Sequence, residues 1–85
     1  MQPPDALNEK ILEGIREVVR SHLQVQDPVE LDTPLVEAWR LDSLRMLTLV
    51  AELENRFQVI FADGDEQGLD TVADLVALLR ARGAS

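Results

Sequence analysis

The sequence predicts an all-helical fold, a small bundle of three main helices with one or two short helical turns. Apolar residues recur at intervals of three and four along three separate stretches. Prolines and glycines interrupt the chain between those stretches. No alternating pattern typical of strands competes with the helical one. The 85 residues are therefore expected to form one small domain.

Composition narrows the classes of function. The formal net charge of −8 argues against nucleic-acid binding, which needs a basic surface. The absence of cysteine excludes disulfides, zinc–thiolate sites and a thiol nucleophile. No apolar run is long enough to span a membrane, and the first residues lack the basic and apolar regions of a signal peptide. We therefore expect a cytoplasmic protein without membrane insertion.

The first helix is predicted over residues 5–22, after a disordered lead-in at residues 1–4. Acids near its start suit the positive end of the helix dipole. His22, the single histidine, lies near the helix end, where a surface residue is expected rather than a catalytic base. The apolar stripe consists of Leu7, Ile11, Ile15, Val18 and Val19, with Leu12 and Leu23 beside it.

A long acidic connection follows at residues 23–41. Asp27-Pro28 and Thr33-Pro34 prevent a continuous helix there. Because a structureless loop of this length is unusual in a small domain, we expect the connection to pack over the core. One helical turn is expected at residues 35–39, with Trp39 as a core anchor. The other expected anchors are Val29, Leu31, Leu35 and Val36.

The second main helix is predicted from Ser43 to Arg56 or Phe57. Asp42 precedes it as a good N-cap, and Ser43 then lies at the positive end of the helix dipole, where an anion is favoured. The core stripe is expected to be Leu49, Val50, Leu53 and Phe57. Leu44, Leu47 and Ala51 fall on another side, so this helix has more apolar surface than a solvated helix needs. Leu44 is expected to contact a partner, whereas Leu47 fits a partner contact or packing against the long connection equally well.

Residues 58–70 are strongly acidic. Asp63-Gly64-Asp65 suggests calcium, but the spacing does not fit an EF-hand loop and its closing glutamate is missing. A solvated loop with a helical turn at residues 63–68 is the better prediction. The last helix then begins near Thr71, with Asp70 or Thr71 as its cap. The folded domain is thus predicted over residues 5–82, followed by a tail at residues 83–85.

Taken together, these landmarks resemble the acyl carrier protein family, which includes the peptidyl carrier domains. The resemblance covers roughly residues 7–80, in order and at family-like spacing. It rests on the whole set of landmarks rather than on the Asp-Ser pair alone. The matching segments are Leu35-Val36-Glu37, Leu41-Asp42-Ser43-Leu44, the helix from Leu49 to Phe57, Phe61, the Asp63/Asp65 turn, Leu69 and Thr71-Val72-Ala73-Asp74-Leu75.

The resemblance implies a compact four-helix bundle with a short third helix. It implies that Ser43 receives 4′-phosphopantetheine from coenzyme A through a separate phosphopantetheinyl transferase, with Asp42 as the helix cap beside the site. Such a domain holds an acyl group as a thioester and catalyses no reaction itself. From the initiator-like Met1 and the short tails we expect a freestanding carrier, and we expect it to be a monomer. Its further partners are an acyl- or aminoacyl-activating ligase and downstream acyl-processing enzymes.

Some positions depart from the family pattern. Arg40 stands where glycine is common, and Arg45 and Thr48 stand where fatty-acid carriers usually have acids. We therefore expect a specialised carrier of a lipid or secondary-metabolite pathway; the alternative is a peptidyl or aminoacyl carrier loaded by an amino-acid-activating ligase. A helical interaction module without a prosthetic group is a different class, in which Ser43→Ala would leave function intact. The partner-binding residues are predicted to be Leu44, Arg45, Leu47, Thr48 and Ala51.

Overall fold

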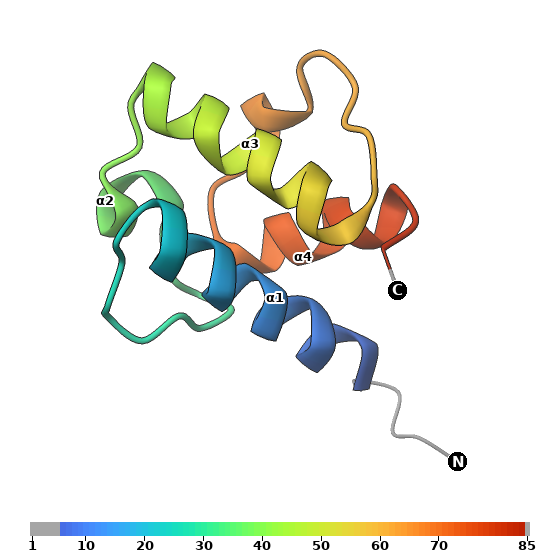
Figure 1. Cartoon of the computed structure of the whole chain (residues 1–85), viewed down its shortest axis with the longest axis horizontal. Coiled ribbons are helices and arrows are strands. Elements are labelled where there is room, and N and C mark those ends of the chain that lie inside the picture. The colour runs from blue at the N-terminus through green and yellow to red at the C-terminus, as the bar shows by residue number, and fades with distance from the viewer. Residues whose placement is uncertain (1–5, 85) are drawn as a thin grey trace.

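The chain is an all-helical bundle, as predicted. The computed structural model describes residues 6–84, so the predicted lead-in at residues 1–4 and the last residue of the predicted tail lie outside the described residues. In chain order the elements are α1 (Ala6–His22), α2 (Leu35–Trp39), α3 (Ser43–Phe57), the 3₁₀ helix η1 (Asp65–Gly68) and α4 (Val72–Ala81), as Figure 1 shows. None of the helices in this range is long and apolar enough to cross a membrane.

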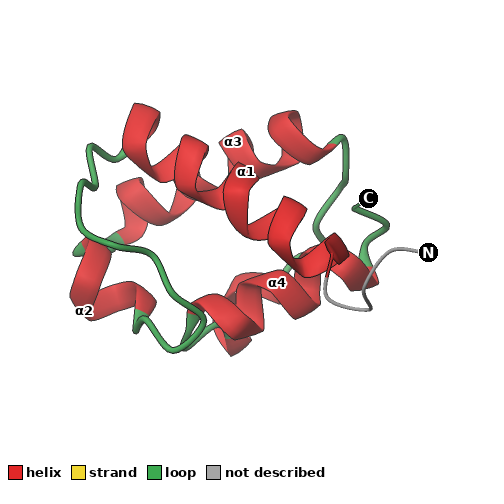
Figure 2. Ribbon diagram, turned by 90° about the horizontal axis from the view of Figure 1, so that it is seen from below, coloured by secondary structure: helices red, strands yellow, loops and turns green. Residues whose placement is uncertain are grey.

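Helix α1 organises the bundle. It packs most extensively against α3 and also against α4. Figure 1 shows α1 and α3 lying side by side with opposite chain directions, and Figure 2 shows α4 across the bundle from them. Burial of one apolar face supplies most of the stability of such helices, because propensity alone is weak in a short helix. The buried residues of α1 are Ile11, Leu12, Gly14, Ile15, Val18 and Val19.

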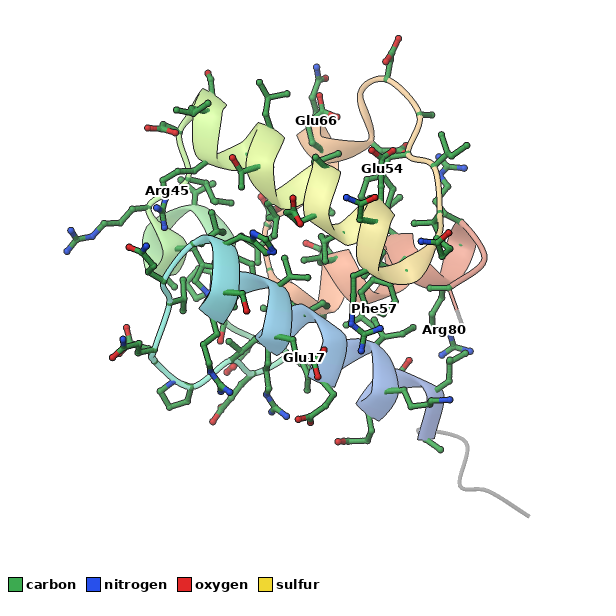
Figure 3. All side chains as sticks on the ribbon, viewed as in Figure 1. Glu17, Arg45, Glu54, Phe57, Glu66 and Arg80 are labelled. Carbon is green, nitrogen blue, oxygen red and sulfur yellow. The ribbon has the colours of Figure 1, made fainter. Side chains whose placement is uncertain are left out.

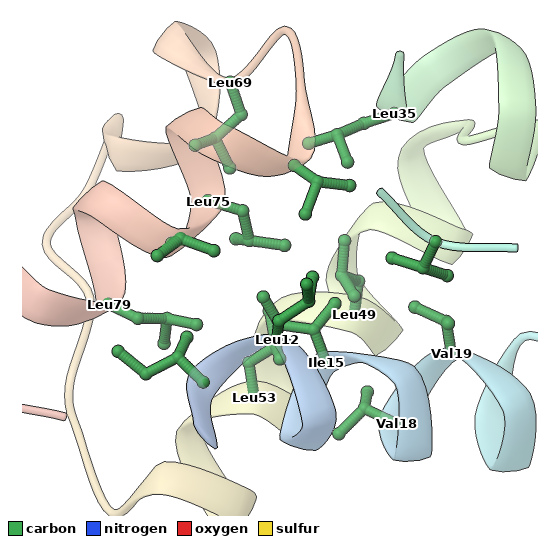
Figure 4. Packing of buried hydrophobic residues seen from close by; sticks show 14 of the residues in the cluster. Leu12, Ile15, Val18, Val19, Leu35, Leu49, Leu53, Leu69, Leu75 and Leu79 are labelled. Carbon is green, nitrogen blue, oxygen red and sulfur yellow. The ribbon is translucent and has the colours of Figure 1, made fainter. Parts of the chain in front are cut away.

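The core is closed by the short helix α2. Trp39, the largest core residue, is only 1% exposed, and Leu35 is fully buried, so both are anchors as predicted. The predictions for Leu31 and Val36 were wrong, because these side chains are 47% and 53% exposed. In α3, Leu49 and Leu53 are buried, whereas Val50 and Phe57 are half-buried at the edge of the core. Figure 4 shows Leu49 and Leu53 packing near Leu12 and Ile15 of α1.

Backbone hydrogen bonds hold the long connection on the bundle. Thr33 and Leu35 flank an isolated antiparallel bridge between Pro34 and Thr71. The Leu35 N–H donates to the Asp70 carbonyl at 2.9 Å, and the Val72 N–H donates to the Thr33 carbonyl at 3.0 Å. These bonds attach the connection to the start of α4, which confirms that it packs against the bundle.

The acidic segment is braced by one ion pair. The Asp65 carboxylate accepts two hydrogen bonds from the Arg82 guanidinium, at 2.7 and 2.8 Å, and one from the Ala62 N–H at 2.8 Å. These bonds, with the one from Arg82 foremost, hold the pKa of Asp65 below its ordinary value. Within residues 6–84 no cluster of three potential metal-ligating side chains is found. Ala84, part of the predicted tail, is buried and folds back onto α4, with its N–H donating to the Leu79 carbonyl.

Helices α1 and α3 meet closely at Gly14. A Cβ atom at this position would lie 2.5 Å from Cζ of Phe57, nearer than any ordinary contact. The Arg56 guanidinium lies over the Phe57 ring, with its Cζ 5.5 Å from the ring centroid. Arg56 is held in turn by Glu17 of α1 at 3.0 Å. Gly14 therefore makes room for the ring that joins the two helices.

We predict that Gly14→Ala fails to stabilise the protein, although alanine is favoured over glycine in a helix by about 1 kcal/mol. The added methyl group must displace the Phe57 ring, which offsets the gain. Phe57→Ala alone should cost about 2 kcal/mol, less than the ~3–5 kcal/mol of a fully buried phenylalanine, because the ring is half-exposed. Urea denaturation of both variants measures these changes.

The double variant Gly14→Ala/Phe57→Ala is the control. With the ring removed, Gly14→Ala should raise the free energy of unfolding by about 1 kcal/mol relative to Phe57→Ala. An equal gain from Gly14→Ala in both backgrounds would show that the ring does not restrict this position.

Candidate functional site

The first turn of α3 presents Ser43 to solvent. Asp42 has the extended backbone of an N-cap, and its carboxylate accepts a hydrogen bond from the Arg45 N–H at 2.8 Å. The Met46 N–H makes the first backbone bond of the helix, to the Asp42 carbonyl at 2.9 Å. Ser43 is the first residue of α3 and is exposed. The capping role predicted for Asp42 is therefore confirmed.

This position suits a covalently attached anion. The first N–H groups of a helix have no partner inside the helix, and they give its N-terminus a partial positive charge. The Asp42 carboxylate accepts from the Arg45 N–H, and the amides of Ser43 and Leu44 precede that capped position at the start of the helix. A phosphodiester on Ser43 would lie in this field while remaining in solvent.

Arg45 joins three segments beneath Ser43. Its Nε and Nη2 atoms donate to the Trp39 carbonyl at 3.1 and 2.9 Å, and Nη2 also donates to the Leu23 carbonyl at 3.0 Å. Figure 3 shows Arg45 at the junction between α2 and the start of α3. We call these bonds the Arg45 clamp.

The clamp satisfies two helix ends at once. Trp39 is the last residue of α2, and Leu23 directly follows the last residue of α1. The final carbonyls of a helix lack partners within the helix and carry partial negative charge, which a guanidinium neutralises. Arg45 was predicted to bind partners, but its hydrogen-bonding groups face these carbonyls. Partner binding by Arg45 stays an untested prediction.

Arg40 adopts a conformation that favours glycine. Its φ of 53° lies in the left-handed region, and it ends α2 with its N–H donating to the Val36 carbonyl. An L-residue here has its Cβ close to the following carbonyl oxygen. The left-handed backbone explains why glycine is common at this position in the family that the chain resembles. Arg40 carries a backbone strain there that glycine would not.

A polar groove adjoins the site. It has a volume of about 640 Å³ and lies between the segment after α1 and the junction of α2 with α3. Arg40, Asp42 and Arg45 line it together with Gln24 and Gln26. Leu23, Val25, Ala38 and Trp39 complete the lining with Asp27, so polar and charged residues form the larger part of the walls but not all of them.

The other predicted partner residues follow Ser43 along α3. Leu44 and Leu47 are 72% and 67% exposed, and Ala51 is also exposed. Leu47 therefore does not pack against the long connection, which removes one of its two interpretations. Thr48 is half-buried, and its hydroxyl donates to the Leu44 carbonyl at 3.1 Å.

His22 is exposed, as predicted. It lies 3.0 Å from Glu52, where the two side chains join α1 to α3. This contact lies far along α3 from Ser43, nine residues away in the sequence. The sequence offered no signal for this pair or for the contact of Arg45 with the Leu23 carbonyl, since the partners lie far apart along the chain.

We predict that Arg45→Met lowers the free energy of unfolding by about 2 kcal/mol, because the carbonyls of Leu23 and Trp39 lose a charged donor. Arg45→Lys should recover less than half of this loss, since an ammonium lacks the planar fork that reaches both carbonyls. Chemical denaturation measures both variants. An Arg45→Met protein as stable as the parent would contradict the clamp.

We also predict that Arg40→Gly raises the free energy of unfolding by about 1 kcal/mol, because glycine adopts a left-handed conformation without strain. Arg40→Ala is the matched control, since it removes the guanidinium but keeps the Cβ atom. Thermal unfolding compares the two. If both variants gain equally, the side chain rather than the backbone is the source of the strain.

The comparisons with known proteins agree with this geometry. The family model described as "Phosphopantetheine attachment site" matches residues 13–79. An acyl carrier protein of Arthrobacter sp. (strain FB24) is 36% identical over 75 residues, which cover 87% of this chain and 93% of that protein. One of Renibacterium salmoninarum is 34% identical over 80 residues, covering 93% and 99% of the two chains. The chain therefore belongs to the acyl carrier protein family, whose members carry a 4′-phosphopantetheine prosthetic group.

Proposed function

We propose that Ser43 is the attachment site of the prosthetic group and that the chain presents an acyl group from it to partner enzymes. The observation that carries the proposal is the exposed hydroxyl at the first position of α3, directly after the Asp42 cap. The family establishes that a phosphopantetheine is carried. The helix N-terminus supplies the field that stabilises the attached phosphodiester.

The side chains around Ser43 have separate roles in this proposal. Asp42 fixes the start of the helix and thereby the direction of the Ser43 hydroxyl. Transfer replaces the hydrogen on Ser43 Oγ by the phosphopantetheinyl phosphorus and releases the nucleotide half of coenzyme A, and the hydroxyl proton passes to the transferase. When bound, the group supplies a thiol that forms a thioester with the acyl cargo, and the chain has no cysteine that could do so.

We further propose a specialised carrier of a lipid or secondary-metabolite pathway, loaded by an acyl-activating ligase and catalysing no reaction itself. The first turn of α3 contains no acid, unlike the acidic helix usual in fatty-acid carriers. A peptidyl or aminoacyl carrier loaded by an amino-acid-activating ligase is the alternative. We expect a cytoplasmic monomer in either case. The acid found on the thiol after incubation with each class of ligase distinguishes the two.

We predict that the protein gains the mass of one phosphopantetheine when it is incubated with coenzyme A and a broad-specificity phosphopantetheinyl transferase. Ser43→Ala should gain none, because the accepting oxygen is absent. Ser21→Ala is the matched control, since Ser21 is also exposed but lies near the end of α1, and it should react like the parent. Intact-mass spectrometry measures all three.

A gain that persists in Ser43→Ala would place the group on another residue and overturn the assignment. If the parent itself gains nothing, the reaction is repeated with the transferase of the native host. Failure with both enzymes would contradict the carrier function, because a carrier without the group has no thiol.

A further inference from the structure

We propose that the polar groove beside Ser43 holds the phosphopantetheine arm of this chain between encounters with partner enzymes. The groove is the hollow of about 640 Å³ between the segment after α1 and the junction of α2 with α3. Its ligand is a long, amide-rich chain anchored at Ser43. The inference rests on the proposed attachment at Ser43 and gives the groove residues a binding role of their own.

The walls of the groove suit a ligand of this chemistry. Six of the ten lining residues are polar or charged, and two of the four apolar ones, Leu23 and Trp39, are only 4% and 1% exposed. Two arginines and two aspartates balance each other, so the lining has no net formal charge. The arm has a hydroxyl and two amides along its length, and its single charge is at the anchored phosphodiester. Such a chain loses less by leaving water for a groove that offers it hydrogen bonds.

Polar side chains of the groove are available to bind the arm. Within residues 6–84, the side-chain hydrogen bonds of the groove residues all belong to Asp42 and Arg45. The side chains of Gln24 and Gln26 line the groove and are exposed. A glutamine amide donates and accepts hydrogen bonds, so it can pair with the peptide-like amides of the arm.

The Arg45 clamp forms the groove before any ligand enters. Its guanidinium binds the carbonyls of Leu23 and Trp39, and the residue after each of these, Gln24 or Arg40, has a left-handed backbone, with φ of 58° and 53°. Both left-handed residues line the groove. Non-glycine residues in this conformation cost free energy and are concentrated at ligand clamps and active sites. Their pairing around one guanidinium indicates a largely pre-formed site, as is usual for ligand pockets.

Attachment at Ser43 brings the arm to the groove. Asp42 and Arg45, which line the groove, are the residues one before and two after Ser43. A tethered ligand has a high effective concentration at a site next to its anchor. A few hydrogen bonds, each modest in water, can therefore hold it there. A partner enzyme withdraws the arm by binding it more tightly than the groove does.

The test loads the isotope-labelled full chain with an unlabelled arm, using coenzyme A and a broad-specificity phosphopantetheinyl transferase. Intact mass first establishes that the arm is attached. Isotope-filtered NOE spectra then detect contacts between protons of the arm and protons of the protein. We expect NOEs from the arm to Gln24, Val25 and Gln26, which are far from Ser43 in the sequence, and a shift of their backbone amide signals on loading.

Gln26→Ala should reduce the shift change at Gln24 to about half or less, the effect expected when a hydrogen bond that holds the arm is lost. Gln26 is suited to this test because its backbone is not left-handed, so the substitution leaves the strain at Gln24 in place. Gln67→Ala is the matched control. Gln67 is also exposed but belongs to η1 and does not line the groove, so this variant should behave like the parent.

The proposal is overturned if the loaded protein shows no NOE between the arm and the groove residues, or if the arm contacts residues of η1 instead. It is also overturned if Gln26→Ala leaves the shift change at Gln24 as large as in the parent. These outcomes leave the attachment intact, since the mass establishes it. A parent that gains no mass with either transferase contradicts the attachment itself, and the binding of the arm in the groove with it.

Discussion

The Arg45 clamp is the interaction on which the position of Ser43 depends. A single guanidinium binds the carbonyl that ends α2 and the carbonyl that follows α1, from the first turn of α3. Cationic side chains are normally unfavourable at a helix N-terminus. Here the unfavourable position is offset, because the guanidinium neutralises two helix C-termini that would otherwise lack partners. The start of α3 is thereby fixed relative to the other two helices, and the exposed serine with it.

The clamp changes how the departures from the family pattern are understood. A basic residue two positions after the serine suggests that a partner meets a positive charge there instead of the usual negative one. The guanidinium of Arg45, however, points into the molecule, toward the Trp39 and Leu23 carbonyls. Two acids follow the same principle elsewhere in the bundle, where Asp65 binds Arg82 and the Asp74 carboxylate accepts hydrogen bonds from the N–H groups of Asp70 and Thr71. Those bonds lower the pKa of Asp74 as well. Net charge alone therefore says little about the surface around Ser43.

Local sequence patterns predicted the helices closely, because each helix combines an apolar period with its own end signals. Asp42 and the apolar run after it predicted α3 from Ser43 to Phe57, as observed. The patterns failed where the outcome depends on distant parts of the chain. Leu31 and Val36 are as apolar as the residues that anchor the connection to the core, but their side chains are exposed. The direction of Arg45 depends on a carbonyl 22 residues earlier, and periodicity carries no information about such a contact.

The two sides of α3 therefore serve different needs. Leu49 and Leu53 are fully buried and couple the helix to α1, while the charged residues between the two sides brace it against neighbouring segments. Leu44 and Leu47 neither pack into the core nor bind a neighbouring segment. Because most of their apolar surface stays in contact with water, they contribute little to stability. Substitutions of these two exposed residues should therefore leave the free energy of unfolding nearly unchanged. In a domain this small, such a separation lets the proposed attachment site at Ser43 keep its position while the exposed residues next to it are free to vary.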